Sequence, residues 1–306
     1  MTVTSRRLPN LVIAGVAKAG TTSLFSYLAQ HPDVCAADEK ELYFFSAPRF
    51  GEPLGPLDEY AAHFRHCRNE RYVMEATPGY FFGGGPTIAL MQRMLDDPRV
   101  LVSLRDPVGR FYSYYGFHQS RGDLPVDLAP AGYLQRCREL RASGVDGRRQ
   151  QTAYWGLSGG CYADVLQAWL DAFGDRLHIV FFEDLQADAG ATVAHICRWA
   201  GLSTEPLSGV DLTAANRTTR FRSPALRSLQ LQLRERGTVL RRRAPRLYAR
   251  AARTLLAVNA TPEGIAPLDS DTRKQLEDFY AESNARVAAM LLRHGYRDLP
   301  DWLGPA

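Results

Sequence analysis

Cysteine is scarce in this chain, and its spacing is irregular. No two cysteines form a Cys-x-x-Cys pair, and their number is odd. This pattern argues against a disulfide framework and against a zinc site, so we expect buried and reduced thiols. The five cysteines are Cys35, Cys67, Cys137, Cys161 and Cys197.

Long apolar runs are also missing. No stretch of about 18 consecutive apolar residues occurs, which excludes an obvious membrane-spanning helix. The first ten residues, MTVTSRRLPN, contain no apolar signal core. The sequence therefore predicts a cytoplasmic protein without the N-terminal anchor of a Golgi-resident protein.

Lysine is rare as well, because the chain has three lysines and 34 arginines. The formal net charge is +4 and the isoelectric point is about 8.8. This mildly basic balance fits an anionic ligand without identifying one. The 306 residues, 45% of them hydrophobic, suffice for one large α/β domain. We predict a single domain over residues 1–306, with a core at about 10–205 and a basic, helical C-terminal segment at about 206–306.

Strand and helix patterns alternate along the core. The predicted strands are mostly continuous apolar runs, which are typical of a parallel sheet covered on both faces. Helical patterns lie between them, and this alternation predicts right-handed crossovers and a P-loop-like parallel sheet flanked by helices. The predicted strands are Leu11–Ala14, Tyr72–Glu75, Val100–Leu104 and Leu177–Phe182; the helices are Thr22–Gln30, Thr87–Leu95, Tyr162–Phe173 and Ala191–Ala200.

The segment from Arg217 to Arg253 is strongly basic, with Glu235 as its one acid. Leucines recur among the arginines, so a basic amphipathic helix pair could rest on a membrane surface or a polyanion. The alternative is an outer helix whose arginines face solvent. A further helix near the C-terminus is amphipathic and is expected to pack back on the core.

The stretch GVAKAGTTSL, residues 15–24, joins the first strand to the first helix. Its glycines, hydroxyls and lysine suit a loop that wraps phosphate at a helix N-terminus. A Walker A loop would need lysine where Thr21 stands, and Lys18 lies three residues earlier. No later strand ends in the acid expected to hold magnesium, so the loop is poorly suited to Mg-ATP.

A second cluster, LVSLRDPVGRFYSYY, follows the strand that ends at Leu104. Arg105 comes directly after the strand, Pro107 suits the first turn of a helix, and Ser113 lies about two turns along it. A guanidinium and a hydroxyl at the next strand-to-helix junction predict a second phosphate pocket. Arg105 could instead be a structural ion-pair partner of Asp106 or Glu75.

Taken together, GVAKAGTTSL, KELYFF, LRDPVGRFYSYY and FFEDL resemble the sulfotransferases that use 3'-phosphoadenosine-5'-phosphosulfate (PAPS). The branch that the motifs resemble contains heparan-sulfate and bacterial carbohydrate sulfotransferases. The resemblance runs from about residue 10 to 200, and it resumes weakly at NRTTRFRSP and LPDW. It implies PAPS as co-substrate and no metal.

The resemblance implies a role for each residue that matches a motif. Lys18 would neutralise charge on the bridging oxygen as the S–O bond breaks, and Arg105 with Ser113 would bind the 3'-phosphate. The segment Asn216–Ser223 would close over the nucleotide. The implied donor-binding residues are Lys18, Ala19, Gly20, Thr21, Thr22, Ser23, Arg105, Ser113, Arg217 and Arg220, with Arg222 as a further candidate near phosphate.

The same resemblance places a catalytic glutamate at Glu41, in ELYFF. His118, in YYGFHQSRG, is the rival general base. The heparan branch tends to carry a lysine where this chain has Ala76. Lys40 could substitute for it, although neighbouring residues on a strand point in opposite directions.

The expected reaction is sulfuryl transfer to a hydroxyl, or to an amine, of a glycan, a glycolipid or a natural product. Aromatic residues near the predicted cleft could stack on the acceptor. We expect no nucleic-acid partner. Two alternatives stay open: a P-loop kinase or NTPase, and a non-catalytic module that binds polyanions through Arg217–Arg253.

Overall fold

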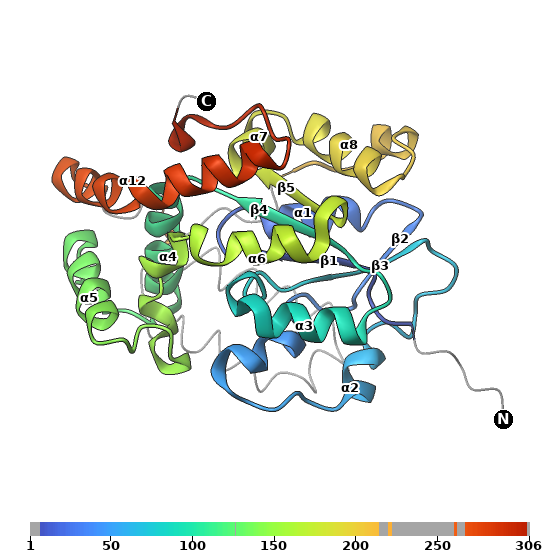
Figure 1. Ribbon diagram of the computed structural model, residues 1–306, viewed down its shortest axis with the longest axis horizontal. Helices are drawn as coiled ribbons and strands as arrows, with labels where there is room; N and C mark the ends of the chain where they lie inside the picture. The colour runs from blue at the N-terminus through green and yellow to red at the C-terminus, as the bar shows by residue number, and fades with distance from the viewer. Residues whose placement is uncertain (1–6, 126, 214–219, 222–259, 262–266, 305–306) are drawn as a thin grey trace. The chain divides into compact units, whose positions relative to one another are not determined.

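Five parallel strands form the central sheet of the computed structural model (Figure 1). The structure describes residues 7–125, 127–213, 220–221, 260–261 and 267–304. The strand order is β2-β3-β1-β4-β5. The strands are β1 (Leu11–Gly15), β2 (Val34–Ala36), β3 (Tyr72–Ala76), β4 (Arg99–Leu104) and β5 (Leu177–Phe181). All four neighbouring pairs are parallel, which confirms the predicted P-loop-like α/β fold.

Helices cover both faces of the sheet, and the alternation along β1 shows why. Val12 and Ala14 pack in one hydrophobic cluster with residues of α3 (Gly84–Met94) and α6 (Ala163–Phe173). Leu11 and Ile13 pack in a second cluster with residues of α1 (Thr21–Leu28) and α8 (Ala189–Ala200). Because successive strand side chains point to opposite faces, a strand between two helical layers must be apolar throughout.

The predicted strands and helices agree with the observed ones to within a few residues. β2 was missed because its three residues, VCA, are too short to show a periodicity. In the described residues the remaining α-helices are α2 (Leu57–Ala62), α4 (Pro107–Arg121), α5 (Pro130–Ala142), α7 (Phe182–Ala187) and α12 (Ser270–Arg293). Short 3-10 helices are η1 (Phe44–Phe50), η2 (Phe81–Gly83), η3 (Arg149–Tyr154), η4 (Ser158–Gly160), η5 (Gly174–Arg176), η6 (Glu205–Gly209) and η7 (Asp301–Leu303).

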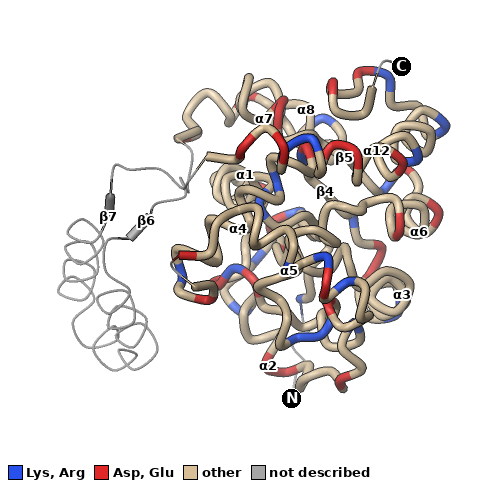
Figure 2. The backbone as a smooth tube through the Cα atoms, turned by 90° about the vertical axis from the view of Figure 1, so that its left-hand side faces the viewer, with Lys and Arg blue, Asp and Glu red and all other residues tan. Residues whose placement is uncertain are grey.

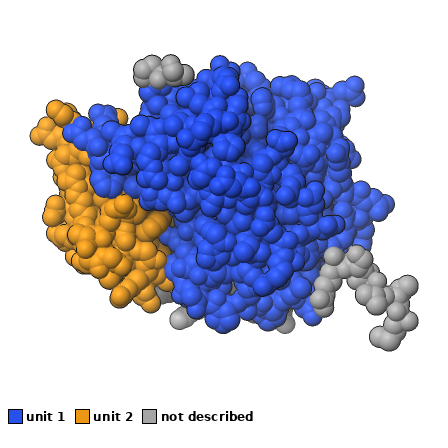
Figure 3. Space-filling view, in the orientation of Figure 1, with its two compact units in different colours: residues 1–110, 159–216, 277–306 blue, residues 111–158, 217–276 orange. Residues whose placement is uncertain are grey.

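The chain divides into two compact units, coloured blue and orange in Figure 3. Unit 1 consists of residues 1–110, 159–216 and 277–306, and it contains the five-stranded sheet. Unit 2 consists of residues 111–158 and 217–276. Within unit 1, Val287, Met290 and Leu291 of α12 belong to the same hydrophobic cluster as the sheet, as expected for the terminal amphipathic helix.

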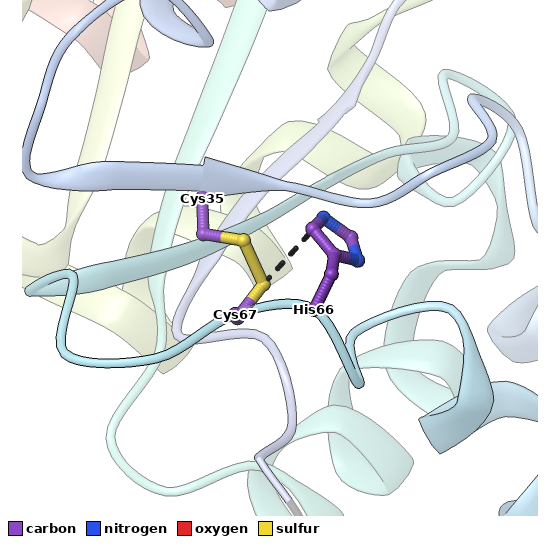
Figure 4. Close-up of side chains that lie close together, drawn as sticks. All are labelled: Cys35, His66 and Cys67. Carbon is purple, nitrogen blue, oxygen red and sulfur yellow. Dashed lines mark hydrogen bonds between the residues drawn. A yellow bond between two sulfur atoms is a disulfide. The ribbon is translucent and has the colours of Figure 1, made fainter.

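The expectation of five reduced thiols was wrong for two cysteines. Cys35 on β2 and Cys67 after α2 form a disulfide, with the imidazole of His66 beside it (Figure 4). A sequence separation of 32 residues carries no signal for this pairing; the packing of the chain after α2 against β2 creates it. The other three cysteines are free and buried, as expected: Cys137, Cys161 and Cys197.

Most of the basic segment Arg217–Arg253 lies outside the described residues and is grey in Figure 2. Its exception is β6 (Arg220–Phe221), which pairs antiparallel with β7 (Ala260–Thr261). The predicted helix pair therefore stays a prediction. Within the described part of the chain, no helix combines the length and the apolar character that crossing a membrane requires.

Candidate active site

The loop between β1 and α1 is shaped by backbone angles that few residues adopt. Gly20 has φ 78° and is the N-cap of α1, and Lys18 has φ 74°. A Cβ atom on Gly20 would lie 2.7 Å from Leu185 Cδ2 and 3.0 Å from Phe182 Cδ2. Both the left-handed angle and the close approach of α7 therefore require glycine at position 20.

The end of β4 holds this loop by three hydrogen bonds. Val16 donates its N–H to the Ser103 carbonyl at 2.8 Å. The Ser103 hydroxyl donates to the carbonyl of Ala19 at 2.6 Å, and Arg105 Nη1 donates to the carbonyl of Lys18 at 3.0 Å. The two predicted phosphate motifs thus form one structure, which we call the donor wall: residues 15–23 and 103–105.

The N-terminus of α1 is open to an anion. Among the described residues no side chain caps this helix, and its first turn contains no acid. The first N–H groups of a helix have no partner within it, and the helix dipole favours negative charge there. Thr21 is buried at this end, whereas Thr22 and Ser23 are half-buried. The arrangement can bind a phosphate or sulfate group.

Lys18 lies in an environment that disfavours its charge. Burial and, to a lesser extent, the nearby Arg105 guanidinium lower the pKa of Lys18 from 10.5 to about 8, against an opposing effect of Glu41. Burial also lowers the pKa of Arg105. Arg110, whose side chain is fully buried, acts on both groups in the same direction. Three cations held this close are stabilised by a bound anion.

Neighbouring groups fix the position of Arg105. Its guanidinium carbon lies 4.3 Å from the centre of the Phe182 ring, and the Tyr162 hydroxyl donates to its carbonyl at 2.8 Å. Asp106 accepts from the backbone of α4 and also acts electrostatically on Arg105, so it stays the alternative ion-pair partner, whereas Glu75 accepts from hydroxyl groups. Arg105 itself donates to the loop of Lys18.

Glu41 lies on a segment of unusual backbone, residues 39–43, which we call the base segment. Glu41 has φ 69° and Tyr43 has φ 57°. Lys40 Nζ lies 2.7 Å from Glu41 Oε1, and the Tyr43 hydroxyl donates to Glu41 Oε2. The expectation that Lys40 and Glu41 point apart was wrong, because the left-handed angle at Glu41 replaces the strand geometry on which it rested.

The base segment is tied to the end of β3. Glu41 donates its N–H to the Ala76 carbonyl at 3.0 Å, and Tyr43 donates its N–H to Thr77 Oγ1 at 3.3 Å. The electrostatic effect of Glu41 and Lys40 on Lys18 places all three side chains in one neighbourhood. Unit 1 therefore brings together Lys18, Arg105, Lys40 and Glu41, which includes two of the three lysines of the chain.

The other predicted site residues belong to unit 2 or lie outside the described residues. Ser113 and His118 are on the part of α4 that belongs to unit 2. His118 is buried, and its Nδ1 lies 2.8 Å from Asp123 Oδ2, which lowers the pKa of Asp123. Arg217 and Arg222 lie outside the described residues, and Arg220 contributes its backbone to β6. The roles of these residues stay predictions.

Several contacts of the site have no signal in the sequence. Phe182 and Tyr162 hold Arg105 from other elements, and Tyr43 binds Glu41. Tyr43 is 53% exposed although it is large and aromatic. Only its place two residues after Glu41, in the aromatic run ELYFF, could have suggested a function.

Comparisons with known proteins bear on the family and the fold of this chain. The sulfotransferase domain model matches residues 8–223. A sulfotransferase crystal structure from Alicyclobacillus acidocaldarius superimposes with a TM-score of 0.70 at 26% identity, over 97% of this chain and 99% of that one.

Two human relatives carry names from heparan sulfate chemistry. The bifunctional heparan sulfate N-deacetylase/N-sulfotransferase 1 is 27% identical over 312 aligned positions, which cover 98% of this chain and 31% of that protein. The heparan sulfate glucosamine 3-O-sulfotransferase 3B1 is 29% identical over 200 positions, which cover 65% of this chain and 47% of that protein. The chain thus spans less than half the length of either relative.

Proposed function

Because the chain belongs to the sulfotransferase domain family, we propose that it transfers a sulfuryl group from PAPS to an acceptor hydroxyl, or less favourably to an amine. The observation that carries this proposal is the donor wall. One loop, one helix terminus without a side-chain cap and two half-buried cations belong to it, and together they suit a polyanion.

The donor fits the charges of the site. The loop of Lys18, with Ala19, Gly20, Thr21, Thr22 and Ser23, would hold the 5'-phosphosulfate. Arg105 would bind the 3'-phosphate, with Ser113 as its second ligand. The lowered pKa values of Lys18 and Arg105 support this assignment, because a polyanion stabilises the charged form of each.

The transfer itself needs a base, an in-line sulfuryl group and charge stabilisation on the leaving oxygen. In our proposal Glu41 accepts the proton of the acceptor hydroxyl, whose oxygen forms the new S–O bond. The bond between sulfur and the bridging phosphate oxygen breaks, and its electron pair stays on the released 3',5'-ADP. Charged Lys18 stabilises that oxygen. His118 with Asp123 remains the alternative base.

In this proposal Lys40 takes the role of the lysine that the heparan branch tends to carry where this chain has Ala76. Ala76 is fully buried on β3, whereas Lys40 contacts Glu41 and acts electrostatically on Lys18. We assign Lys40 to the equatorial oxygens of the sulfuryl group. Its ammonium group would share the excess negative charge that develops during transfer.

We propose a carbohydrate as the acceptor. The names of the relatives support this choice, and so does the exposed ring of Tyr43 beside Glu41, since aromatic faces pack against sugar rings. Glycolipids and glycosylated natural products present the same chemistry. Contact of the basic C-terminal segment with a membrane or polyanion belongs to this proposal as a means of holding such an acceptor.

Calorimetric titration with 3',5'-ADP, 5'-AMP and Mg-ATP in metal-free buffer tests the donor site. We expect 3',5'-ADP to bind with micromolar affinity and the other two nucleotides much more weakly. Equal binding of 5'-AMP would contradict the assignment of Arg105 and Ser113 to the 3'-phosphate. Tight binding of Mg-ATP would favour a kinase.

A further inference from the structure

Glu75 is a buried carboxylate without an assigned role. It lies on β3, one residue before the strand ends, and its side chain is fully buried. A carboxylate in such a place is costly unless other groups satisfy its oxygens. Burial raises the pKa of Glu75, and hydrogen bonds from neighbouring hydroxyls oppose that rise.

Three hydroxyl groups from three places in the sequence donate to Glu75. Tyr60, on α2, donates to Oε2. Tyr80 donates to Oε1 at 2.6 Å, and Thr77 donates to the same oxygen at 2.8 Å. Both tyrosines are buried, and burial together with Glu75 raises the pKa of each well above its ordinary value. They therefore remain hydroxyl donors at pH values at which an ordinary tyrosine ionises.

One of these donors connects Glu75 to the base segment. Thr77 Oγ1 donates its hydrogen to Glu75 and accepts the N–H of Tyr43 at 3.3 Å. Because the hydroxyl of Thr77 donates its hydrogen bond to Glu75, the lone pairs of Thr77 Oγ1 are available to accept the backbone N–H of Tyr43. We call the hydrogen-bonded series from Glu75 through Thr77 to the backbone of Tyr43 the relay. The backbone N–H of Thr77 donates to the carbonyl of Ile13 on β1 at 3.1 Å, which anchors the relay to the central sheet.

The base segment needs such an anchor. Glu41 and Tyr43 both adopt left-handed backbone angles, which cost free energy for residues with a side chain and persist only when their surroundings impose them. Two hydrogen bonds attach the segment to the end of β3: Glu41 N–H to the Ala76 carbonyl and Tyr43 N–H to Thr77 Oγ1. Of the two, only the second depends on side chains.

We propose that Glu75 is a positioning residue for sulfuryl transfer: through Thr77 it orients the backbone of the base segment and so places the Glu41 carboxylate. The inference rests on the proposed function. Glu75 touches neither donor nor acceptor in this assignment, and its effect reaches the reaction only through Glu41. The proposal predicts that breaking the relay lowers the rate of turnover and leaves the affinity for the donor nucleotide unchanged.

The decisive variants change Thr77 rather than the buried charge. Thr77→Val removes the hydroxyl at nearly constant volume, whereas Thr77→Ser keeps it. Thr192→Val is the matched control, because Thr192 is buried on α8 and its hydroxyl donates to the Asp188 carbonyl at 2.9 Å, outside the relay. Glu75→Gln keeps the shape of the side chain and replaces one acceptor oxygen by a donor.

Two readouts decide the question. Turnover is measured with PAPS and a desulfated heparin oligosaccharide. We expect Thr77→Val and Glu75→Gln to lower kcat by about 10- to 100-fold, as a misplaced catalytic group does, while Thr77→Ser restores it and Thr192→Val leaves it unchanged. Amide hydrogen exchange over residues 39–45 should be faster in Thr77→Val than in the wild-type protein. It should be unchanged in Thr77→Ser and in Thr192→Val.

The outcomes separate this inference from the proposed function. Unchanged exchange over residues 39–45 in Thr77→Val overturns the positioning role, whether or not the oligosaccharide is an acceptor. Weakened 3',5'-ADP binding in Thr77→Val equally contradicts it, because the relay would then support the whole site. Failure of the wild-type protein to bind 3',5'-ADP contradicts the proposed function, whereas the exchange result still describes the relay.

Discussion

The donor wall and the base segment solve the same problem, the exact placement of charged groups, by different means. In the donor wall, Ser103 and Arg105 at the end of β4 hold three residues of the loop after β1, Val16, Lys18 and Ala19, through hydrogen bonds between 2.6 and 3.0 Å. The base segment also has left-handed residues, and the Ala76 carbonyl and the Thr77 hydroxyl at the end of β3 hold them in place. The wall joins two strand-to-helix turns of neighbouring strands, each visible as a motif in the sequence, whereas no sequence motif marks the anchor of the base segment.

The largest expected effect falls on the base segment. Glu41→Gln removes the proposed base and should lower kcat by about 10²- to 10⁴-fold. The affinity for 3',5'-ADP should not fall, because Glu41 lies outside the donor wall and its negative charge, which acts on Lys18, does not attract an anion. Turnover and calorimetry on the same preparations check both statements.

The rival base is examined with His118→Gln. If Glu41→Gln retains near-normal turnover while His118→Gln loses it, the assignment of the base moves to the pair of His118 and Asp123.

The donor wall should respond differently to substitution. Lys18→Ala should lower kcat by about 10²- to 10³-fold, because a charge that stabilises the leaving oxygen is lost. In contrast to Glu41→Gln, it should also weaken 3',5'-ADP binding. Lys274→Ala provides the matched control, since Lys274 is exposed on α12. Normal transfer by Lys18→Ala would remove this lysine from the mechanism.

The disulfide should matter more for the base segment than for the donor wall. Cys35 and Cys67 close a covalent ring that contains residues 39–43 and excludes both parts of the wall. Loop-closure entropy for about 32 residues predicts that reduction lowers the free energy of unfolding by roughly 3–4 kcal/mol. Urea unfolding with and without a phosphine reductant measures this change.

Thiol counts show whether the bond is present. The denatured protein should show three reactive thiols before reduction and five afterwards. Cys197→Ser is a control in which a buried free thiol changes and the ring stays closed. Equal stability of reduced and oxidised protein would contradict the proposed constraint.

The smallest expected effect is a pH dependence confined to the donor wall. The pKa of Lys18 is about 8 in the free protein, against 10.5 for an ordinary lysine. A bound polyanion raises it, so binding above pH 8 takes up a proton and affinity falls with rising pH, by at most about tenfold per unit. Below pH 8 the charge on Lys18 lowers the free energy of unfolding, because the folded protein disfavours that charge. This loss of stability becomes smaller as the pH rises from 8 to 10.5.

Calorimetry in buffers of different ionisation enthalpy detects that proton uptake. It should be present at pH 9 in the wild-type protein and in Glu75→Gln, and absent in Lys18→Ala. Proton uptake that persists in Lys18→Ala would show that another group of the wall titrates.

Local patterns were sufficient for much of the fold. Continuous apolar runs predicted four of the five strands of the central sheet, because strands buried on both faces must be apolar throughout. The fifth strand, Val34–Ala36, is too short for such a pattern and is recognised only by its pairing with β3. The disulfide was missed for a related reason: two cysteines 32 residues apart meet only after β2 and the chain following α2 have packed.

By itself, the sequence determined the parallel sheet and the loop of residues 15–23, because a buried strand, a glycine turn and a helix N-terminus are all encoded within a few residues. Tertiary structure decided how residues 103–105 hold that loop and how Glu41 is presented. Lys40 and Glu41 face each other through a left-handed residue, and Glu75 and Thr77 at the end of β3 meet Tyr60 of α2. Such contacts depend on three-dimensional distance, which no spacing along the chain expresses.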